Sequence, residues 1–202
     1  MPIDRHNLRE NLVSAWDKAL QQVKVIRQGD GADNHWTRAK IWVDAVGDRF
    51  RTNYPEPDRV FWEGNAAHRT EFKKNELLFD IMVCSIATID SFQRPPQPLA
   101  FIDQCHWQVE SELNNKDTRE IVIDMSKLVA GSAAHKLMIA AYPETAGNRK
   151  KNGRALLCRC AKIAARCVGE VYFCFIAHPR EWDSNPKSPA LYEYTARGWE
   201  LR

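Results

Sequence analysis

The sequence predicts an α/β fold in which a central mixed sheet is flanked by helices. Asn11–Arg27 carries apolar residues at helical spacing, and Leu77–Ile89 is nearly continuous in apolar residues, as expected for a strand buried on both faces. Phe101–Leu113 alternates apolar and polar residues with a period of two, which is typical of a half-buried strand. From Arg119 onward, helical and apolar strand patterns alternate, and this order indicates an α/β protein.

Composition and charge set broad limits on function. The chain has 202 residues, 44% hydrophobic and 27% charged, which is ordinary for a soluble globular protein, and we expect a single domain over residues 1–202. The net charge of +3 does not by itself indicate a nucleic-acid partner, so the position of the basic residues must carry that argument. No apolar run reaches the length of a membrane span and the amino terminus lacks an apolar signal core, which predicts a cytoplasmic protein without a membrane partner.

The six cysteines are spread through apolar segments. Because the chain shows no export signal and no small-scaffold spacing, they are expected to be reduced, buried thiols. Cys158 and Cys160 lie close together in a helical pattern, but no histidine or carboxylate stands nearby at ligand spacing. A zinc site is therefore not expected.

The N-terminal part, residues 1–50, is expected to be helical. The helix at Asn11–Arg27 should end near Gly29 or Gly31, since glycine commonly terminates helices. A second helix should run from about His35 to Phe50, with its tryptophans in the core. The next expected elements are a short strand at Arg59–Trp62 and a turn or single helical turn at Arg69–Asn75.

One acidic residue, Asp80, interrupts the apolar strand predicted at Leu77–Ile89. A carboxylate buried in a strand is costly unless it is paired or bound to a metal. The alternative is an aspartate at a fraying strand start, capped by nearby amides. The polar residues Asn75 and Glu76 just before the strand favour this alternative.

The strand at Phe101–Leu113 ends in two carboxylates, Glu110 and Glu112, on its polar face. Residues two apart on a strand lie about 6.6 Å from each other along one face, close enough to share one cation. Like charges in a row repel and glutamate is depleted in strands, which argues against a purely structural pair. The alternative is the solvated outer face of an antiparallel sheet, which commonly carries polar residues.

The Pro-rich turn at Asp90–Pro98 joins these two strands, and consecutive strands joined in this way usually pair antiparallel. Such pairing would bring Asp80, at the start of one strand, close to Glu110 and Glu112 at the end of the other. A cluster of acids needs counter-charge, and oxygen ligands favour Mg²⁺ or Mn²⁺. The sequence therefore predicts a metal site with Asp80, Glu110 and Glu112 as ligands.

Alternating helices and strands over residues 59–177 and a C-terminal hairpin over residues 190–202 complete the predicted fold. The hairpin either extends the sheet or makes a dimer contact, and the sequence leaves both open. The predicted elements are a helix at Arg119–Gly131, a strand at Lys136–Tyr142, a helix at Arg149–Val168, a strand at Gly169–Ala177, and hairpin strands at Leu191–Tyr194 and Trp199–Leu201.

A second functional signal is the helix predicted at Arg149–Val168, which contains many basic residues and no acid. At 100° per residue, its apolar and basic residues separate onto two faces. A face of one sign suits a polyanion such as a phosphate backbone. The alternative is an ordinary solvated face that pairs with acids from elsewhere. The predicted nucleic-acid-binding residues are Lys151, Arg154, Arg159, Lys162 and Arg166.

Asp80, the Glu110-Ser111-Glu112 ending of the second strand, and the helix and apolar strand that follow resemble the PD-(D/E)XK nuclease superfamily, which has the restriction-endonuclease-like fold. The resemblance covers roughly Leu77–Tyr142 and rests on a short motif. In that superfamily the first acid and the paired acid bind magnesium. The resemblance therefore implies a restriction-endonuclease-like core with its metal at these carboxylates.

The chain departs from the superfamily pattern at several points. Phe79 stands where the family has a proline before the aspartate, and the spacing from Asp80 to Glu110 is long. Glu112 stands where the family usually has lysine, although a subset of restriction enzymes has glutamate there, including a Glu-Ser-Glu version. Lys127 or Lys136 would supply the displaced positive group, and each is equally well interpreted as a surface lysine.

The resemblance implies an endonuclease that hydrolyses phosphodiester bonds with Mg²⁺ or Mn²⁺, and double-stranded DNA is the expected partner. The implied catalytic residues are Asp80, Glu110, Glu112 and Lys127, with Glu112 or Lys127 orienting the attacking water. Two alternatives remain at this point: a non-catalytic nucleic-acid-binding module with a degenerate nuclease fold, and an interaction protein with a solvated acidic strand. A homodimer is also left open.

Overall fold

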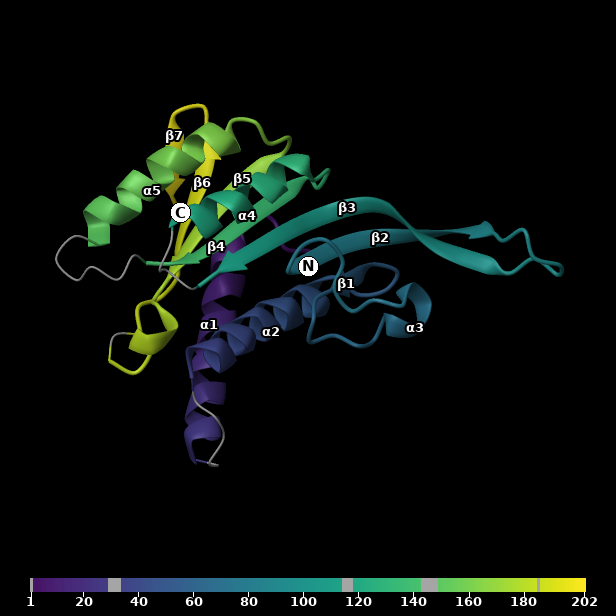
Figure 1. Cartoon of the computed structure of the whole chain (residues 1–202), viewed down its shortest axis with the longest axis horizontal. Helices are drawn as coiled ribbons and strands as arrows, with labels where there is room; N and C mark the ends of the chain where they lie inside the picture. Colours follow the sequence, from purple (N-terminus) through teal and green to yellow (C-terminus); the bar gives the residue numbers. More distant parts are fainter. Residues whose placement is uncertain (1, 29–33, 114–117, 143–148, 185) are drawn as a thin grey trace.

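The structure, a computed structural model, describes residues 2–28, 34–113, 118–142, 149–184 and 186–202. These residues form a seven-stranded mixed sheet whose strands lie side by side in sequence order, from β1 to β7. Helices cover both faces of the sheet (Figure 1). The predicted α/β class, with a mixed sheet flanked by helices, is confirmed.

The element bounds lie within a few residues of those predicted. The helices are α1 (Leu8–Gln28), α2 (His35–Asn53), α3 (Arg69–Phe72), α4 (Thr118–Ala130) and α5 (Arg149–Ala164), with a 3-10 turn, η1, at Pro179–Glu181. The strands are β1 (Arg59–Phe61), β2 (Ile81–Asp90), β3 (Pro98–Glu112), β4 (His135–Ala141), β5 (Glu170–Ile176), β6 (Ala190–Thr195) and β7 (Gly198–Leu201).

The pairing of neighbouring strands changes twice across the sheet, from antiparallel to parallel and back. β1, β2 and β3 pair antiparallel, whereas β3, β4 and β5 pair parallel. Parallel neighbours need crossover connections, and α4 and α5 supply them on one face of the sheet. β6 and β7 return antiparallel to β5, so the C-terminal hairpin extends the sheet.

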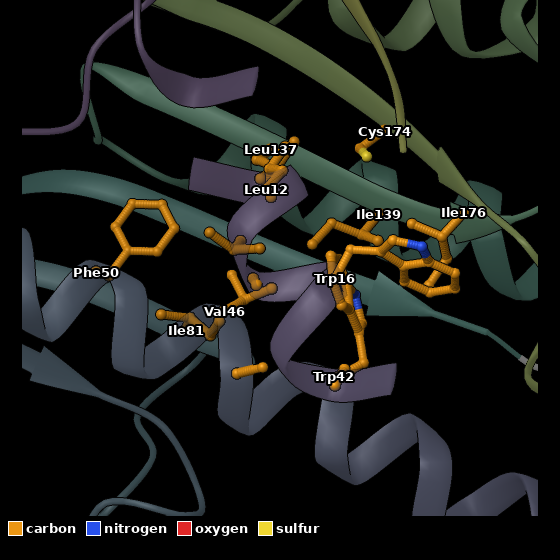
Figure 2. Packing of buried hydrophobic residues seen from close by; sticks show 14 of the residues in the cluster. Leu12, Trp16, Trp42, Val46, Phe50, Ile81, Leu137, Ile139, Cys174 and Ile176 are labelled. Carbon is orange, nitrogen blue, oxygen red and sulfur yellow. The ribbon is translucent and has the colours of Figure 1, made fainter. Parts of the chain in front are cut away.

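Two hydrophobic clusters fill the space on either side of the sheet. On one face, α1 and α2 pack on β1–β5, and Trp16 and Trp42 contact each other edge to face, with ring centroids 5.8 Å apart (Figure 2). On the other face, α4 and α5 pack through residues such as Met125 and Cys160 on Met138 of β4. The predicted tryptophan core is therefore confirmed for Trp42 but wrong for Trp36, which lies in the first turn of α2 and is 62% exposed. No helix in the described ranges is long and apolar enough to cross a membrane.

Two details of β2 and β3 differ from the sequence prediction. β2 begins at Ile81 rather than Leu77, so Asp80 comes just before the strand instead of inside it. The β2–β3 register shifts after Val83, and Cys105 consequently belongs to the cluster under α4 and α5 while Trp107 faces α1 and α2. A β-bulge of this kind breaks the period of two, which the alternation in the sequence does not reveal. The predicted helix end at Gly29 or Gly31 lies outside the described residues.

Beyond the sheet, β2 and β3 continue as a long two-stranded hairpin that leaves the body of the molecule (Figure 1). Phe101, which the alternation predicts to be buried, is 39% exposed because none of the helices in the described ranges covers this part of β3. The core-facing half of β3 therefore begins only at Cys105.

Candidate active site

The β2–β3 register brings together the acids that the sequence separates by about thirty positions. Ile81 pairs with Val109 in the antiparallel ladder, so the preceding residue, Asp80, lies opposite Glu110. The backbone N–H of Ser111 donates a hydrogen bond of 2.7 Å to Oδ2 of Asp80. The Asp80 carboxylate is thereby attached to the Glu110-Ser111-Glu112 ending of β3, as the antiparallel pairing predicts.

Glu110 lies under α4 and is almost completely buried. It pairs with Met138 of the parallel neighbour β4, and Met138 belongs to the cluster that packs against α4 and α5. The exposed fraction of Glu110 is only 1%. The interpretation of this face as a solvated outer surface is therefore wrong for Glu110, because the crossover helix covers it.

Helix α4 supplies two further charged groups beside Glu110. Nζ of Lys127 lies 3.3 Å from Oε2 of Glu110 and 2.7 Å from Oδ1 of Asp124. Lys127 is thus next to the acids, as expected of the displaced positive group. Asp124 was not predicted as part of the site. Its position three residues before Lys127, on the same helical face, is the sequence signal that would have indicated it.

The electrostatics of this cluster favour an added cation. Burial, together with the negative charge of Asp80, raises the pKa of Glu110 to about 8, although Lys127 opposes the shift. Burial also raises the pKa of Asp80, against the hydrogen bond from Ser111. Oε1 of Glu110 has no hydrogen-bond partner among the described residues. A buried carboxylate oxygen without a donor is costly, and a metal ion or a proton would satisfy it.

A pocket connects the acids to the surface on the α2 side of the sheet. Its volume is about 350 Å³, and its wall contains Asp80, Ser111 and the half-buried Glu112 from the sheet. Trp36 and Lys40 of α2 line the opposite wall. Glu112 therefore borders this pocket next to Asp80, whereas Glu110 is buried under α4 and is not among the lining residues.

The donor set fits Mg²⁺ better than a metal that needs a closed protein cage. Within the described part of the chain, no three side chains of His, Cys, Asp or Glu are grouped so that they could hold a metal ion. Mg²⁺ keeps several waters and commonly uses only one or two protein carboxylates together with substrate phosphates. Asp80 and the orphaned Oε1 of Glu110 match that requirement.

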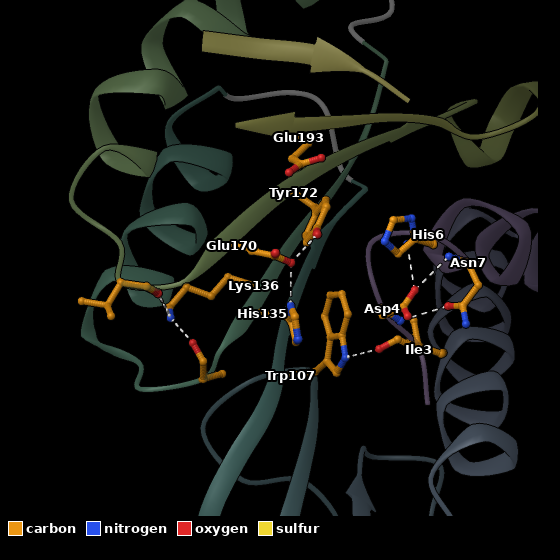
Figure 3. A network of polar contacts seen from close by, with 12 residues as sticks. Ile3, Asp4, His6, Asn7, Trp107, His135, Lys136, Glu170, Tyr172 and Glu193 are labelled. Atoms are coloured by element: carbon orange, nitrogen blue, oxygen red, sulfur yellow. Dashed lines mark hydrogen bonds and ion pairs between the residues drawn. The ribbon is translucent and has the colours of Figure 1, made fainter. Parts of the chain in front are cut away.

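The other candidate lysine, Lys136, lies away from the acids. Its side chain is fully buried, and Nζ donates to the backbone carbonyls of Ala133 and Val168 (Figure 3). Burial lowers the pKa of Lys136. Both suggested roles for Lys136, surface lysine and positive group of the site, are therefore wrong, since its donors are used to join the amino ends of β4 and β5.

A second polar cluster occupies the same amino ends of β4 and β5. Oε2 of Glu170 lies 2.9 Å from Nδ1 of His135 and accepts a 2.6 Å hydrogen bond from the Tyr172 hydroxyl (Figure 3). The Trp107 ring stacks on His135 with centroids 4.7 Å apart. Trp107 precedes Glu110 by three residues, about 10 Å along the strand, so this cluster is separate from the acidic site.

The basic residues of α5 lie on the outer surface of the helix that packs on the same face of the sheet as Glu110. All are exposed, and none forms an ion pair with an acid in the described ranges. The alternative in which acids from elsewhere neutralise this face therefore finds no support among these residues. They are Lys151, Arg154, Arg159 and Lys162 of α5 together with Arg166, two residues past its end.

The structure thus brings three of the four predicted catalytic residues, Asp80, Glu110 and Lys127, into one cluster and puts Glu112 in the adjoining pocket. Comparison of the chain with protein-family models, with curated proteins and with solved structures finds no match. Its function must therefore be inferred from its own side chains.

Proposed function

We propose that this protein is a Mg²⁺-dependent endonuclease that cleaves double-stranded DNA and has a restriction-endonuclease-like core. The observation that carries the proposal is a pair of neighbouring carboxylates, the half-buried Asp80 just before β2 and the buried Glu110 of β3. Lys127 does not fully offset their negative charge, and Oε1 of Glu110 has no donor among the described residues. An antiparallel hairpin followed by a crossover helix and a parallel strand agrees with the order expected from the resemblance.

Each side chain of the site has a distinct task in this proposal. Asp80 and Glu110 would hold the cation, and Glu112 lies beside Asp80 on the pocket wall. When bound there, Mg²⁺ would polarise the scissile phosphate and lower the pKa of an attacking water. The nearby charge of Lys127 lowers the pKa of Glu110 and so favours the ionised form that binds a metal, and Lys127 or Glu112 would orient the water.

The exposed basic face of α5 supplies the contacts to the DNA backbone. Phosphate contacts orient a duplex on the protein without reading its sequence, and Lys and Arg side chains are their usual donors. An unpaired basic face on the same side of the sheet as Glu110 is therefore suited to position a scissile phosphate near the acids.

A non-catalytic nucleic-acid-binding module is the second candidate. Glu112 occupies the position where the nuclease pattern usually has lysine, and no three-ligand metal group is found in the described ranges. This candidate keeps DNA binding through α5 but predicts no metal-dependent cleavage.

The direct test is cleavage of double-stranded DNA with Mg²⁺ and with a chelator in its place. We expect cleavage only with Mg²⁺, and we expect Asp80→Asn to abolish it and to weaken Mn²⁺ binding measured by titration calorimetry. Asp17→Asn, an equivalent change at an exposed position of α1, is the matched control and should retain both. DNA binding without cleavage in any divalent metal would support the binding module instead.

The role of α5 is tested by its salt dependence. In the triple variant Arg159→Ala, Lys162→Ala, Arg166→Ala, we expect weaker DNA binding for every sequence. Each lost phosphate contact should reduce the slope of log K against log salt by about one. The control is a second triple alanine variant with the same loss of charge, made at three exposed positions outside α5: Arg9, Lys24 and Lys187. It should change the salt slope much less. Equal slopes in the two triple variants would remove α5 from the DNA interface.

A further inference from the structure

The hairpin formed by β2 and β3 carries unpaired edges and exposed apolar side chains beyond the sheet. β1 pairs with β2 only up to Cys84, and β4 pairs with β3 only from Trp107 onward. Residues 85–104, here called the ribbon arm, therefore have only each other as strand partners in the described structure (Figure 1). The exposed large apolar residues of the arm are Ile89, Phe92, Leu99, Phe101 and Ile102.

An isolated two-stranded ribbon is marginally stable in water, and several exposed large apolar side chains on such a ribbon indicate an interaction site. The arm contains two acids, Asp90 and Asp103, and one base, Arg94, so its net charge is −1. A negative net charge does not suit DNA. The arm is therefore expected to contact protein.

The tip of the arm exposes an aromatic side chain, and the base of the arm borders a pocket. At the tip, Phe92 is completely exposed, with a relative accessibility of 107%. At the base, a pocket of about 520 Å³ opens between the arm and the end of α4, and its apolar wall includes Leu78, Phe79 and Met82. An aromatic side chain entering an apolar pocket is the usual centre of a stable interface.

The tip and the base of the arm also carry opposite charges. Arg94 lies at the tip and Asp103 lines the pocket at the base, and neither forms an ion pair with a described residue. From Pro98, where β3 begins, Asp103 is five residues away, about 17 Å along the strand. If two arms lay antiparallel, the tip of each would meet the base of the other, and both the apolar and the charged contacts would form twice.

We propose that this chain forms a two-fold symmetric homodimer in which Phe92 of each arm enters the pocket at the base of the arm of the second copy, with Arg94 beside Asp103 of that copy. The inference is independent of the proposed nuclease activity, since it uses none of the acidic residues of that site. A single chain carries both the exposed Phe92 and a pocket that can receive it, and both edges of its arm lack a strand partner in the described structure. A second copy of the chain is therefore the partner that fits the arm.

The test is the oligomeric state of the full chain, measured by sedimentation equilibrium over a wide concentration range. We expect a dimer for the wild type and a dimer dissociation constant at least about tenfold higher for Phe92→Ser. Val25→Ser, an exposed apolar residue on α1, is the matched control and should leave the dimer unchanged. Because Phe92 is fully exposed in the single chain, its replacement should leave thermal unfolding unchanged at concentrations where both proteins are monomeric.

Charge reversal makes the test specific to tip-to-base pairing. Arg94→Asp alone and Asp103→Arg alone should each weaken the dimer, because both tip-to-base contacts become repulsive. Mixing the two single variants should restore a dimer, since each heterodimer contact again joins opposite charges, and the double variant should dimerise by itself. A wild type that stays monomeric, a dimer insensitive to Phe92→Ser, or single variants that fail to complement would each overturn the proposal.

Discussion

Glu110→Gln is expected to abolish Mg²⁺-dependent cleavage while the metal-free protein keeps or gains thermal stability. The carboxylate is buried under α4 with an orphaned oxygen, next to Asp80 and Asp124, so its charge is unfavourable until a cation neutralises it. The metal supplies several kcal/mol of transition-state stabilisation, so a loss of about a thousandfold or more in rate is expected. Activity and stability should therefore move in opposite directions in paired cleavage and melting experiments.

The pH dependence of stability gives this prediction a second measurement. The pKa of Glu110 rises from 4.5 to about 8 on folding, so between these values the folded protein binds a proton that the unfolded chain has lost. Glu110 therefore lowers the free energy of unfolding of the metal-free wild type as pH rises from 4.5 to about 8. Above pH 8 this effect of Glu110 no longer changes with pH. Glu110→Gln should lack this contribution, whereas Glu120→Gln at an exposed position of α4 should behave like wild type. A Gln variant that melts lower and still cleaves would contradict the proposed role of Glu110.

Lys127→Met is expected to reduce cleavage at neutral pH by about a hundredfold, with partial recovery at higher pH. The Lys127 charge lowers the pKa of both Glu110 and Asp80, so its removal leaves these acids more fully protonated. Metal binding requires deprotonated carboxylates, and a higher pH restores them. The measurement is the pH–rate profile, whose acidic limb should shift to higher pH.

The matched variants separate this electrostatic role from a structural one. Lys127→Arg keeps the positive charge and should retain the pH profile of the wild type with a smaller loss of rate. Lys24→Met, on the opposite face of the sheet, removes a lysine from an exposed position and should change neither the profile nor the rate. A Lys127→Met variant with an unchanged profile and rate would exclude Lys127 from the site.

Much of the fold was predictable because it depends on local patterns. The helical periodicity of Asn11–Arg27 and the continuous apolar run that contains β2 reflect which faces are buried, and burial dominates folding energetics. The pairing of β2 with β3 followed from the short connection between them, and it brought Asp80 to Glu110. These features are encoded by spacing along the chain, and spacing can be read without coordinates.

Tertiary structure decided the environment of each site residue. Glu110 has a raised pKa because α4 packs over it, and Asp124 and Lys127 reach it only through the crossover that links β3 to β4. Lys136 and Glu110 are both polar residues within strand patterns, and the fold buries both. Lys136 donates to backbone carbonyls, whereas Glu110 lies among acids. Burial, desolvation and the juxtaposition of distant side chains depend on how layers pack, and no local pattern in the sequence contains that information.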